Sequence, residues 1–258
     1  MLERLGLWAQ DRGRELLYAA GFFYQILRET GSFLRRRSPG SQVLTMQILF
    51  TGVAALPVIA VASVAIGAVI IVQGLTLLPQ FGQGQVMYPV LVAVITRELG
   101  PILTAFIVTA RSGTAITTEL GHMVVSHEIE AYVASGISPI GHIAVPRFLG
   151  VTVSTMLLNV YFNVFGLGAS FLVTQFVRTI SFSEYFGNLL AVISLVDIVA
   201  SLVKSLVFGA LIAVVSTYHG FAVQRSVTEI PQRAIRSVGQ NVVLLIIANA
   251  IVTLIYYL

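Results

Sequence analysis

Residues 90–110 read VLVAVITRELGPILTAFIVTA, and this stretch decides the fold class. Apart from Arg97 and Glu98 it carries no charge, and no charged side chain occurs between Ser38 and Thr96 before it. An ionisable residue at the centre of a membrane helix costs roughly 2.5–3.5 kcal/mol on insertion scales. A chain that keeps two of them side by side either neutralises them internally or uses them. The stretch therefore predicts a polar site inside a membrane protein.

The composition agrees with this reading. Of the 258 residues, 57% are hydrophobic and only 10% are charged, whereas soluble domains are about 25% charged. The absence of cysteine excludes disulfides, thiol catalysis and cysteine metal sites. The net charge of +4 comes from arginines that flank apolar runs, which indicates membrane topology rather than nucleic-acid binding. Met1–Arg4 lacks the layout of a cleaved signal peptide, so we expect the first span to act as an uncleaved insertion signal.

The first 37 residues form a basic lead with apolar residues at roughly helical spacing, among them Trp8, Phe22, Phe23 and Phe33. This pattern predicts an amphipathic helix in the headgroup region over residues 1–37. The alternative is a solvated cytosolic helix.

Residues 38–258 are predicted to form an all-α, five-span integral membrane domain, because the apolar runs are of spanning length and polar turns separate them. The expected spans are 44–78, 86–110, 148–177, 185–218 and 237–258. The first is longer than a bilayer requires, so we expect it to be tilted, kinked near Pro57 or extended beyond the membrane. The arginines gather at the N-terminus and in the loops after the second and fourth spans. By the positive-inside rule these parts are cytoplasmic and Leu258 lies outside.

Two further charges fall inside the fourth span. Asp197 and Lys204, the only lysine, are two helical turns apart on one face, about 10 Å along the axis. One alternative is that these charges neutralise one another and lock the bundle, and Lys204 could instead pair with Glu98 across helices. The other is that they line a polar cavity together with Arg97 and Glu98. Gly100-Pro101 favours the cavity, because a proline removes a backbone hydrogen bond and kinks the helix.

The sequence contains no motif that indicates an enzyme active site. The sequence has no phosphate-binding P-loop and no HExxH motif, and His122 and His127 are not spaced to share a helix face. Ser112-Gly113 lacks the glycine two residues earlier that an intramembrane serine protease requires. We therefore expect no catalytic residue, no metal site and no cofactor in this chain.

Residues 117–134 mix acidic and apolar side chains, which predicts a short amphipathic helix along the cytoplasmic surface. Such a helix can dock into the groove of a partner protein. A solvated loop is the alternative.

Three motifs resemble a known family, the MlaE-type permeases of lipid-trafficking ABC transporters that work with MCE proteins. They are Arg97-Glu98-Leu99-Gly100-Pro101, Ala110-Arg111-Ser112-Gly113-Thr114-Ala115 and Thr118-Glu119-Leu120-Gly121-His122-Met123. Gln73-Gly74 and Pro146-Arg147-Phe148 also match, so the resemblance covers nearly the whole chain.

The resemblance implies a homodimer in the bacterial inner membrane, with two cytoplasmic ATPase subunits that bind ATP and Mg²⁺ and an MCE-protein ring on the outer side. It implies a phospholipid pocket at or near Gln73, Arg97, Glu98 and Leu99, and a role in outer-membrane lipid asymmetry. The helix at 117–134 becomes the coupling helix that docks the ATPase. Its implied contacts are Glu119, His127, Glu128, Ile129, Glu130 and Tyr132.

One departure lies in that helix. The family commonly has Glu-Gln-Ile-Asp-Ala-Leu where this chain has His127-Glu128-Ile129-Glu130-Ala131-Tyr132, so the ATPase contact is expected to differ in detail. The fifth span carries Asn249 and no charge. The rival interpretations are a scaffold or channel subunit without directed transport, and a permease for another hydrophobic substrate.

Overall fold

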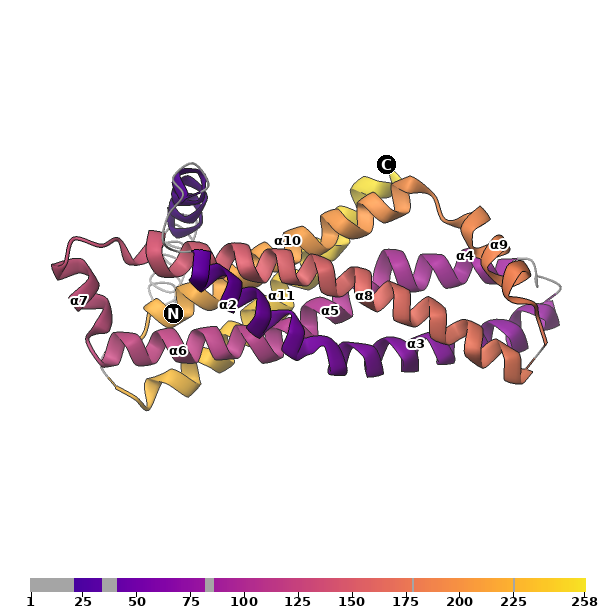
Figure 1. Ribbon diagram of the computed structural model, residues 1–258, viewed down its shortest axis with the longest axis horizontal. Coiled ribbons are helices and arrows are strands. Elements are labelled where there is room, and N and C mark those ends of the chain that lie inside the picture. Colours follow the sequence, from indigo (N-terminus) through magenta and orange to yellow (C-terminus); the bar gives the residue numbers. More distant parts are fainter. Residues whose placement is uncertain (1–20, 34–40, 82–85, 178, 225) are drawn as a thin grey trace, which may run out of the picture.

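Long helices run side by side along one axis of the molecule, with short helices joining them at the two ends (Figure 1). The computed structural model describes residues 21–33, 41–81, 86–177, 179–224 and 226–258. Within these ranges the chain forms helices and no strand, and five helical segments are long and apolar enough to cross a membrane. The predicted all-α, five-span fold class is thus confirmed.

The first two crossings are each made of several helical pieces. The first comprises α2 (Ser41–Thr51), the 3₁₀ turn η1 (Val53–Ala55), α3 (Leu56–Leu77) and the 3₁₀ turn η2 (Leu78–Phe81). The second comprises α4 (Met87–Val92), the π-helix η4 (Ala93–Leu99), α5 (Gly100–Val108), the π-helix η5 (Thr109–Gly113) and α6 (Thr114–Val125).

The remaining crossings are more regular. The third joins the π-helix η6 (Ile140–Ala144) to α8 (Val145–Val177), the fourth is α10 (Leu195–Phe221) and the fifth is α11 (Glu229–Tyr257). Two short helices, α7 (Glu128–Ala134) and α9 (Phe182–Val192), lie at opposite ends of the bundle (Figure 1).

Of the three alternatives for the long first span, a kink near Pro57 agrees with an interruption of the helix just before that residue. The chain changes from α-helix to a 3₁₀ turn at Val53–Ala55, and α3 then begins with Pro57 in its first turn. A proline is tolerated there because first-turn N–H groups have no partner within the helix.

Several helices extend beyond the predicted spans. The helix of the second span continues to Val125 rather than ending at 110, that of the third begins at Ile140 rather than 148, and that of the fifth begins at Glu229 rather than 237. In each case the helix extends as a more polar segment past the apolar run, because helical hydrogen bonding does not require an apolar sequence.

The fourth predicted span, 185–218, is divided in the structure. Residues 182–192 form α9, and Ser194 then caps the start of α10. The Ser194 hydroxyl accepts a hydrogen bond from the Asp197 N–H, and the Asp197 carboxylate accepts one from the Ser194 N–H, so the two residues form a capping box. This reciprocal cap starts a new helix. Tyr185 anchors α9 from a fully buried position, 2.7 Å from the Ser170 hydroxyl, and burial raises its pKa to about 12.

The single helix predicted over 117–134 is also wrong. The structure ends α6 at Val125 and begins α7 at Glu128, and His127 between them has a φ of 61°. This left-handed conformation interrupts the helix and turns α7 away from α6.

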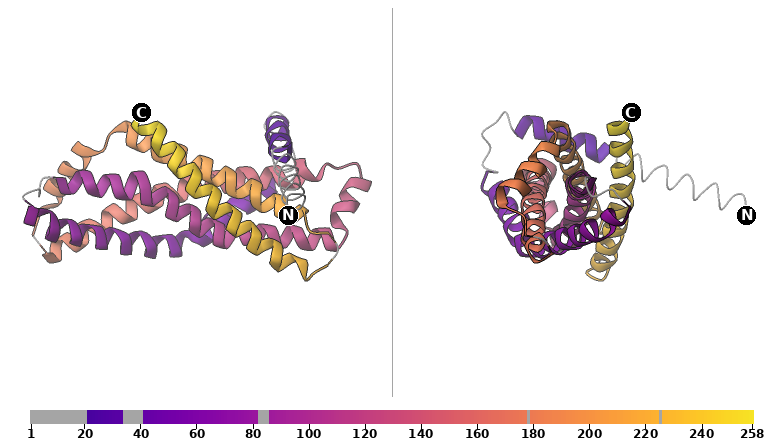
Figure 2. Two further views of the ribbon diagram at one scale, coloured as in Figure 1. Left: turned by 180° about the vertical axis from the view of Figure 1, so that it is seen from behind. Right: turned by 90° about the vertical axis from the view of Figure 1, so that its right-hand side faces the viewer.

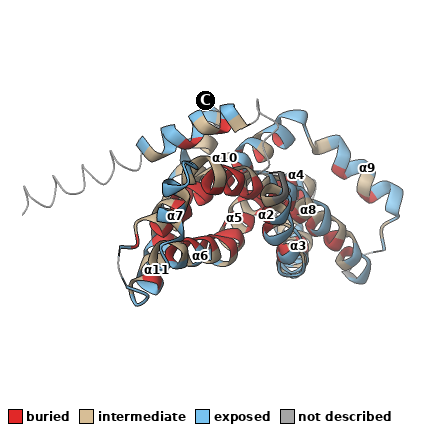
Figure 3. Cartoon of the chain, turned by 60° about the vertical axis from the view of Figure 1, so that its left-hand side comes forward, coloured by how far each residue is buried: buried red, intermediate tan, exposed pale blue. Residues whose placement is uncertain are grey.

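The spans differ in how far they are covered. Buried residues line the inward faces of α6 and α10, whereas α9 presents much exposed surface (Figure 3). Half of the α10 membrane window is buried, against 11% of the α11 window. Close contact between α3 and α8 depends on small residues, because a Cβ on Gly67 would lie 2.2 Å from the Gly166 carbonyl oxygen.

Only part of the predicted lead helix at 1–37 lies within the described residues. Residues 21–33 are helical and run across the bundle rather than along it (Figures 1 and 2). Ile26 is fully buried, and Phe22 contacts the rings of Tyr218 and Phe221. The helix is therefore held against α10, and its placement in the headgroup region stays a prediction.

Candidate functional site

The π-helix η4 places Arg97 and Glu98 inside the bundle. Its last backbone bond runs from the Gly100 N–H to the Ile95 carbonyl, five residues back, and Pro101 follows in the first turn of α5. Proline has no N–H, so it cannot donate to the carbonyl of Arg97 four residues earlier. The ammonium of Lys204 donates to that carbonyl instead, at 2.8 Å.

Glu98 is the meeting point of three spans. One carboxylate oxygen lies 2.9 Å from the Lys204 ammonium, and Asn249 and Thr253 of α11 each donate to the carboxylate at 3.2 Å. The Lys204 side chain is only 3% exposed, whereas that of Glu98 is 36% exposed. The second, fourth and fifth spans thus share one polar cluster at membrane depth.

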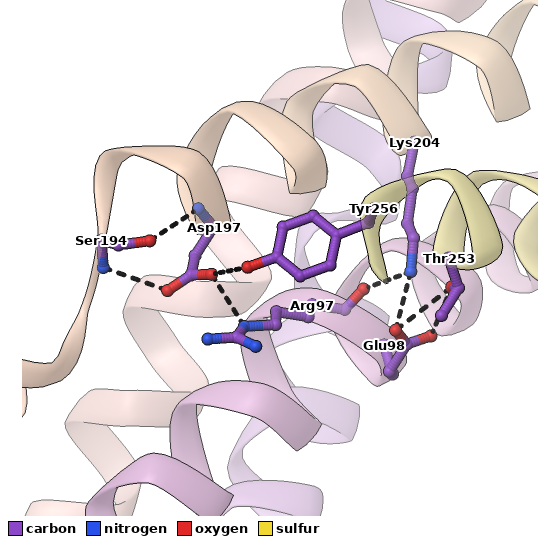
Figure 4. A network of polar contacts seen from close by, with 7 residues as sticks. All are labelled: Arg97, Glu98, Ser194, Asp197, Lys204, Thr253 and Tyr256. Atoms are coloured by element: carbon purple, nitrogen blue, oxygen red, sulfur yellow. Dashed lines mark hydrogen bonds and ion pairs between the residues drawn. The ribbon is translucent and has the colours of Figure 1, made fainter. Parts of the chain in front are cut away.

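Arg97 turns to a different carboxylate (Figure 4). Its Nε lies 2.8 Å from Asp197 Oδ1, its guanidinium lies 5.4 Å from the centre of the Tyr256 ring, and the Tyr256 hydroxyl donates to the same Asp197 oxygen at 2.8 Å. The Asp197 side chain is fully buried, and that of Arg97 is 24% exposed.

The four charges form two ion pairs and sum to zero. We refer to Arg97, Glu98, Asp197 and Lys204 with Asn249, Thr253 and Tyr256 as the charged network. Its two buried charges belong to α10, and its two partly exposed charges belong to the second span. Such a site can present a cation and an anion to a ligand while most of the charge stays compensated.

The pairing differs in part from the sequence analysis. The Lys204–Glu98 contact that was one of the alternatives is present, and Asp197 and Lys204 serve different partners. Arg97 pairs with Asp197, although Glu98 is its neighbour in the sequence.

Sequence reasoning missed Ser194, Thr253 and Tyr256. Thr253 and Tyr256 follow Asn249 by four and seven residues, the spacing of one helix face, which is the signal that points to them. Leu99 is partly buried at the end of η4. Gln73 is exposed on α3, and across the described residues no hydrogen bond joins its side chain to the charged network.

The residues implied for ATPase coupling separate into two groups. Glu119 lies on α6 and pairs at 2.7 Å with Arg147, whose side chain is 8% exposed, so this ion pair ties α6 to the start of α8. His127, Glu128 and Glu130 are exposed at the turn into α7, where His127 Nδ1 lies 3.0 Å from Glu130.

Ile129 and Tyr132, the two apolar residues among those implied for ATPase coupling, pack against the hydrophobic core. The ring of Tyr132 lies 5.6 Å from that of His142. α7 therefore rests on the bundle by one face and exposes acidic side chains on the other.

Comparison with known proteins gives consistent matches. Residues 44–255 match the family model described as Permease MlaE. A probable ABC transporter permease of Rickettsia typhi is 28% identical over 82% of each chain. The intermembrane phospholipid transport system permease protein MlaE of Haemophilus influenzae is 24% identical over 76% of each chain. The chloroplastic protein TRIGALACTOSYLDIACYLGLYCEROL 1 of Arabidopsis thaliana is 26% identical over 82% of this chain and 60% of its own.

Proposed function

Because this chain belongs to the MlaE permease family, whose members are membrane subunits of ABC transporters, we propose that it moves phospholipid between the bacterial inner membrane and an MCE-protein partner. ATP hydrolysis with Mg²⁺ in separate cytoplasmic subunits supplies the energy. The name of the Haemophilus relative supports phospholipid as the substrate class.

The observation that carries the proposal is the uneven burial of the charged network. A pair that only locked the helices together would be covered on both sides, yet Glu98 and Arg97 keep 36% and 24% of their side-chain surface at membrane depth. A phospholipid headgroup brings a phosphate, which a guanidinium binds well, and often an ammonium that a carboxylate accepts. Headgroup and charged network are thus complementary.

Other features support the proposed assembly. Only 11% of the α11 window is buried, so this helix has an apolar face that a second copy of the chain could cover in a homodimer. The acidic turn into α7 offers a contact for the ATPase, and the MCE ring would lie at the opposite end, near α9. The distribution of arginines favours a cytoplasmic N-terminus and a periplasmic Leu258.

In the proposed cycle, closure of the ATPase subunits pushes on α7. Because α6 continues directly into η5, α5 and η4, a push at this end is passed along one continuous helix to Arg97 and Glu98. The pocket between the two copies narrows and the lipid shifts.

A double-substitution experiment separates transport from a purely structural role. Removing one partner of a buried ion pair leaves an uncompensated charge, whereas removing both is often tolerated. We expect Glu98→Gln and Lys204→Met singly to lower the thermal stability of the purified complex. The double variant should recover most of that stability, but not the part that the hydrogen bond from Lys204 to the Arg97 carbonyl supplies. The same double variant should lose roughly tenfold or more of ATP-dependent phospholipid transfer to acceptor vesicles, about 1.4 kcal/mol.

Glu29→Gln, on the helix of residues 21–33 and outside the charged network, is the matched control and should leave transfer unchanged. Full transfer by the stable double variant would reject a substrate role for the charged network. No ATP-dependent transfer by the wild-type complex would favour the scaffold interpretation instead. Running the assay with a galactolipid beside the phospholipid tests the second candidate substrate, which the name of the Arabidopsis relative suggests.

A further inference from the structure

Arg111 differs from Lys204, Arg97 and Arg147, the cations of the fourth, second and third spans that have carboxylate partners. Lys204, Arg97 and Arg147 each lie within 3 Å of a carboxylate. Among the residues that the structure describes, no carboxylate pairs with Arg111. It donates one hydrogen bond, from Nη1 to the Phe50 carbonyl at 3.1 Å, and its guanidinium lies 5.4 Å from the centre of the Phe50 ring. A guanidinium has five N–H donors, so most of its binding capacity is left over.

The local backbone holds Arg111 in this position. It lies in the π-helix η5, and the Thr114 hydroxyl donates to the carbonyls of Ala110 and Arg111 at 2.6 and 2.9 Å. Phe50 is next to last in α2, where carbonyl groups lack donors from their own helix. The second span therefore has two π-helices, each with one arginine, and π-helices are frequent at functional sites.

The surface beside Arg111 is apolar and open. Met46, Leu49, Phe50 and Val53 of α2 and η1 are between 47% and 63% exposed. From Met87 to Arg111 the helix rises roughly 36 Å at about 1.5 Å per residue, against a hydrocarbon thickness of about 30 Å. Arg111 thus lies near the membrane boundary on the α7 side, with apolar side chains available for an acyl chain.

We propose that Arg111 and the exposed face of α2 bind a phospholipid from the leaflet on the α7 side. The guanidinium holds the phosphate, Phe50 orients the guanidinium, and the acyl chains lie against Met46, Leu49 and Val53. A guanidinium that has no carboxylate partner within the described part of the chain favours an anion, and the adjoining apolar surface favours one that carries hydrocarbon. Arg97, in the charged network, is roughly 21 Å away along the helix. The Arg111 site is therefore separate, and it binds lipid whether or not the chain transports it.

Photo-crosslinking tests this site. Benzoylphenylalanine is placed at position 46, one turn before Phe50, in the full chain within nanodiscs of equal parts phosphatidylglycerol and monogalactosyldiacylglycerol. The same probe at position 172, which is 62% exposed on α8, is the control. We expect phosphatidylglycerol adducts to exceed galactolipid adducts by about threefold at position 46, roughly 0.65 kcal/mol, and the two adducts to be near parity at position 172.

Arg111→Gln should abolish the preference at position 46 without changing the adducts at 172, and Arg111→Lys should keep part of it, because lysine retains the charge but not the fork of donors. An unchanged preference in Arg111→Gln would overturn the proposal. So would crosslinks at position 46 that join two protein chains instead of chain and lipid. If Arg111→Gln does not fold, equal adduct ratios at positions 46 and 172 in the wild type are sufficient to reject it.

Discussion

The ammonium of Lys204 takes the place of the backbone donor that the helix of Arg97 lacks. It lies 2.8 Å from the Arg97 carbonyl oxygen and 2.9 Å from the Glu98 carboxylate. Because Pro101 has no N–H, this carbonyl would otherwise lack its α-helical partner in a medium without water. One side chain of the fourth span therefore satisfies both a backbone group and a charge of the second.

This relationship predicts that the effects of Pro101→Ala and Lys204→Met are coupled. Alanine restores an N–H at position 101, so the Arg97 carbonyl regains a backbone donor and depends less on Lys204. We expect Lys204→Met to destabilise the Pro101→Ala protein by about 1 kcal/mol less than it destabilises the wild type, the net value of one hydrogen bond. Thermal unfolding of the four proteins in detergent measures the coupling. Purely additive effects would contradict the assignment.

The second prediction concerns the ion pair between Arg97 and Asp197. Asp197→Asn leaves the Arg97 guanidinium without its buried counter-charge and weakens the capping box with Ser194. We expect a loss of about 3–5 kcal/mol for breaking such a pair, against about 0.5–1.5 kcal/mol for Tyr256→Phe, which removes one hydrogen bond. Denaturation in mild detergent with increasing dodecyl sulfate compares the two variants. Equal losses would show that the ion pair adds nothing to the hydrogen bond.

The third prediction compares alanine substitutions at two glycines, Gly67 and Gly168, to test the close packing of α3 against α8. A Cβ on Gly67 would lie 2.2 Å from the Gly166 carbonyl oxygen, whereas a Cβ on Gly168 meets nothing within 4 Å. Gly67→Ala forces α3 away from α8 and should cost about 1–3 kcal/mol by overpacking. Gly168→Ala should be neutral or stabilising by up to about 1 kcal/mol, because alanine favours the helix. The melting temperature of Gly67→Ala is expected to fall while that of Gly168→Ala stays level or rises, and a fall of equal size in both would refute the close α3–α8 contact.

The fourth prediction tests the acidic turn into α7. Reversing the charges of Glu128 and Glu130 to lysine should release the ATPase subunits during affinity purification, because both side chains are exposed and neither supports the core. Glu184→Lys, an acidic residue of α9 at the other end of the bundle, is the control and should keep the ATPase bound. Co-purification of the ATPase with the doubly reversed variant would reject α7 as its docking element.

The number of spans could be predicted because apolar runs of membrane length are separated by short polar stretches of sequence, as in residues 79–85. The span boundaries could not, since helices such as α6 continue beyond the apolar run. The break at Ser194 is a capping box, visible in the sequence as Ser194 followed three residues later by Asp197. The interruption at His127 carries no comparable signal, because a left-handed residue that is not glycine is set by its surroundings.

The charged network could be predicted only as a set of residues. The positions of Arg97, Glu98, Asp197 and Lys204 in apolar runs mark them as intramembrane charges. Their pairing depends on the register between α10 and η4, and the extra residue per turn of a π-helix rotates Arg97 and Glu98 away from the directions that an α-helix would give them. Adjacent side chains of a helix point in different directions, and here Arg97 meets Asp197 while Glu98 meets Lys204.

The sequence distance between the partners has a consequence for biogenesis. Asp197 follows Arg97 by 100 positions, and Lys204 lies 106 positions after Glu98. When the second span leaves the ribosome, neither counter-charge has yet been synthesised. Each ionisable residue costs roughly 2.5–3.5 kcal/mol of insertion free energy. The nascent hairpin of the first two spans therefore bears this cost for Arg97 and Glu98 until the fourth span brings their partners. We therefore expect that hairpin to stay beside the insertion machinery until the fourth span is made, and the fifth span then adds the hydrogen bonds of Asn249 and Thr253 to Glu98.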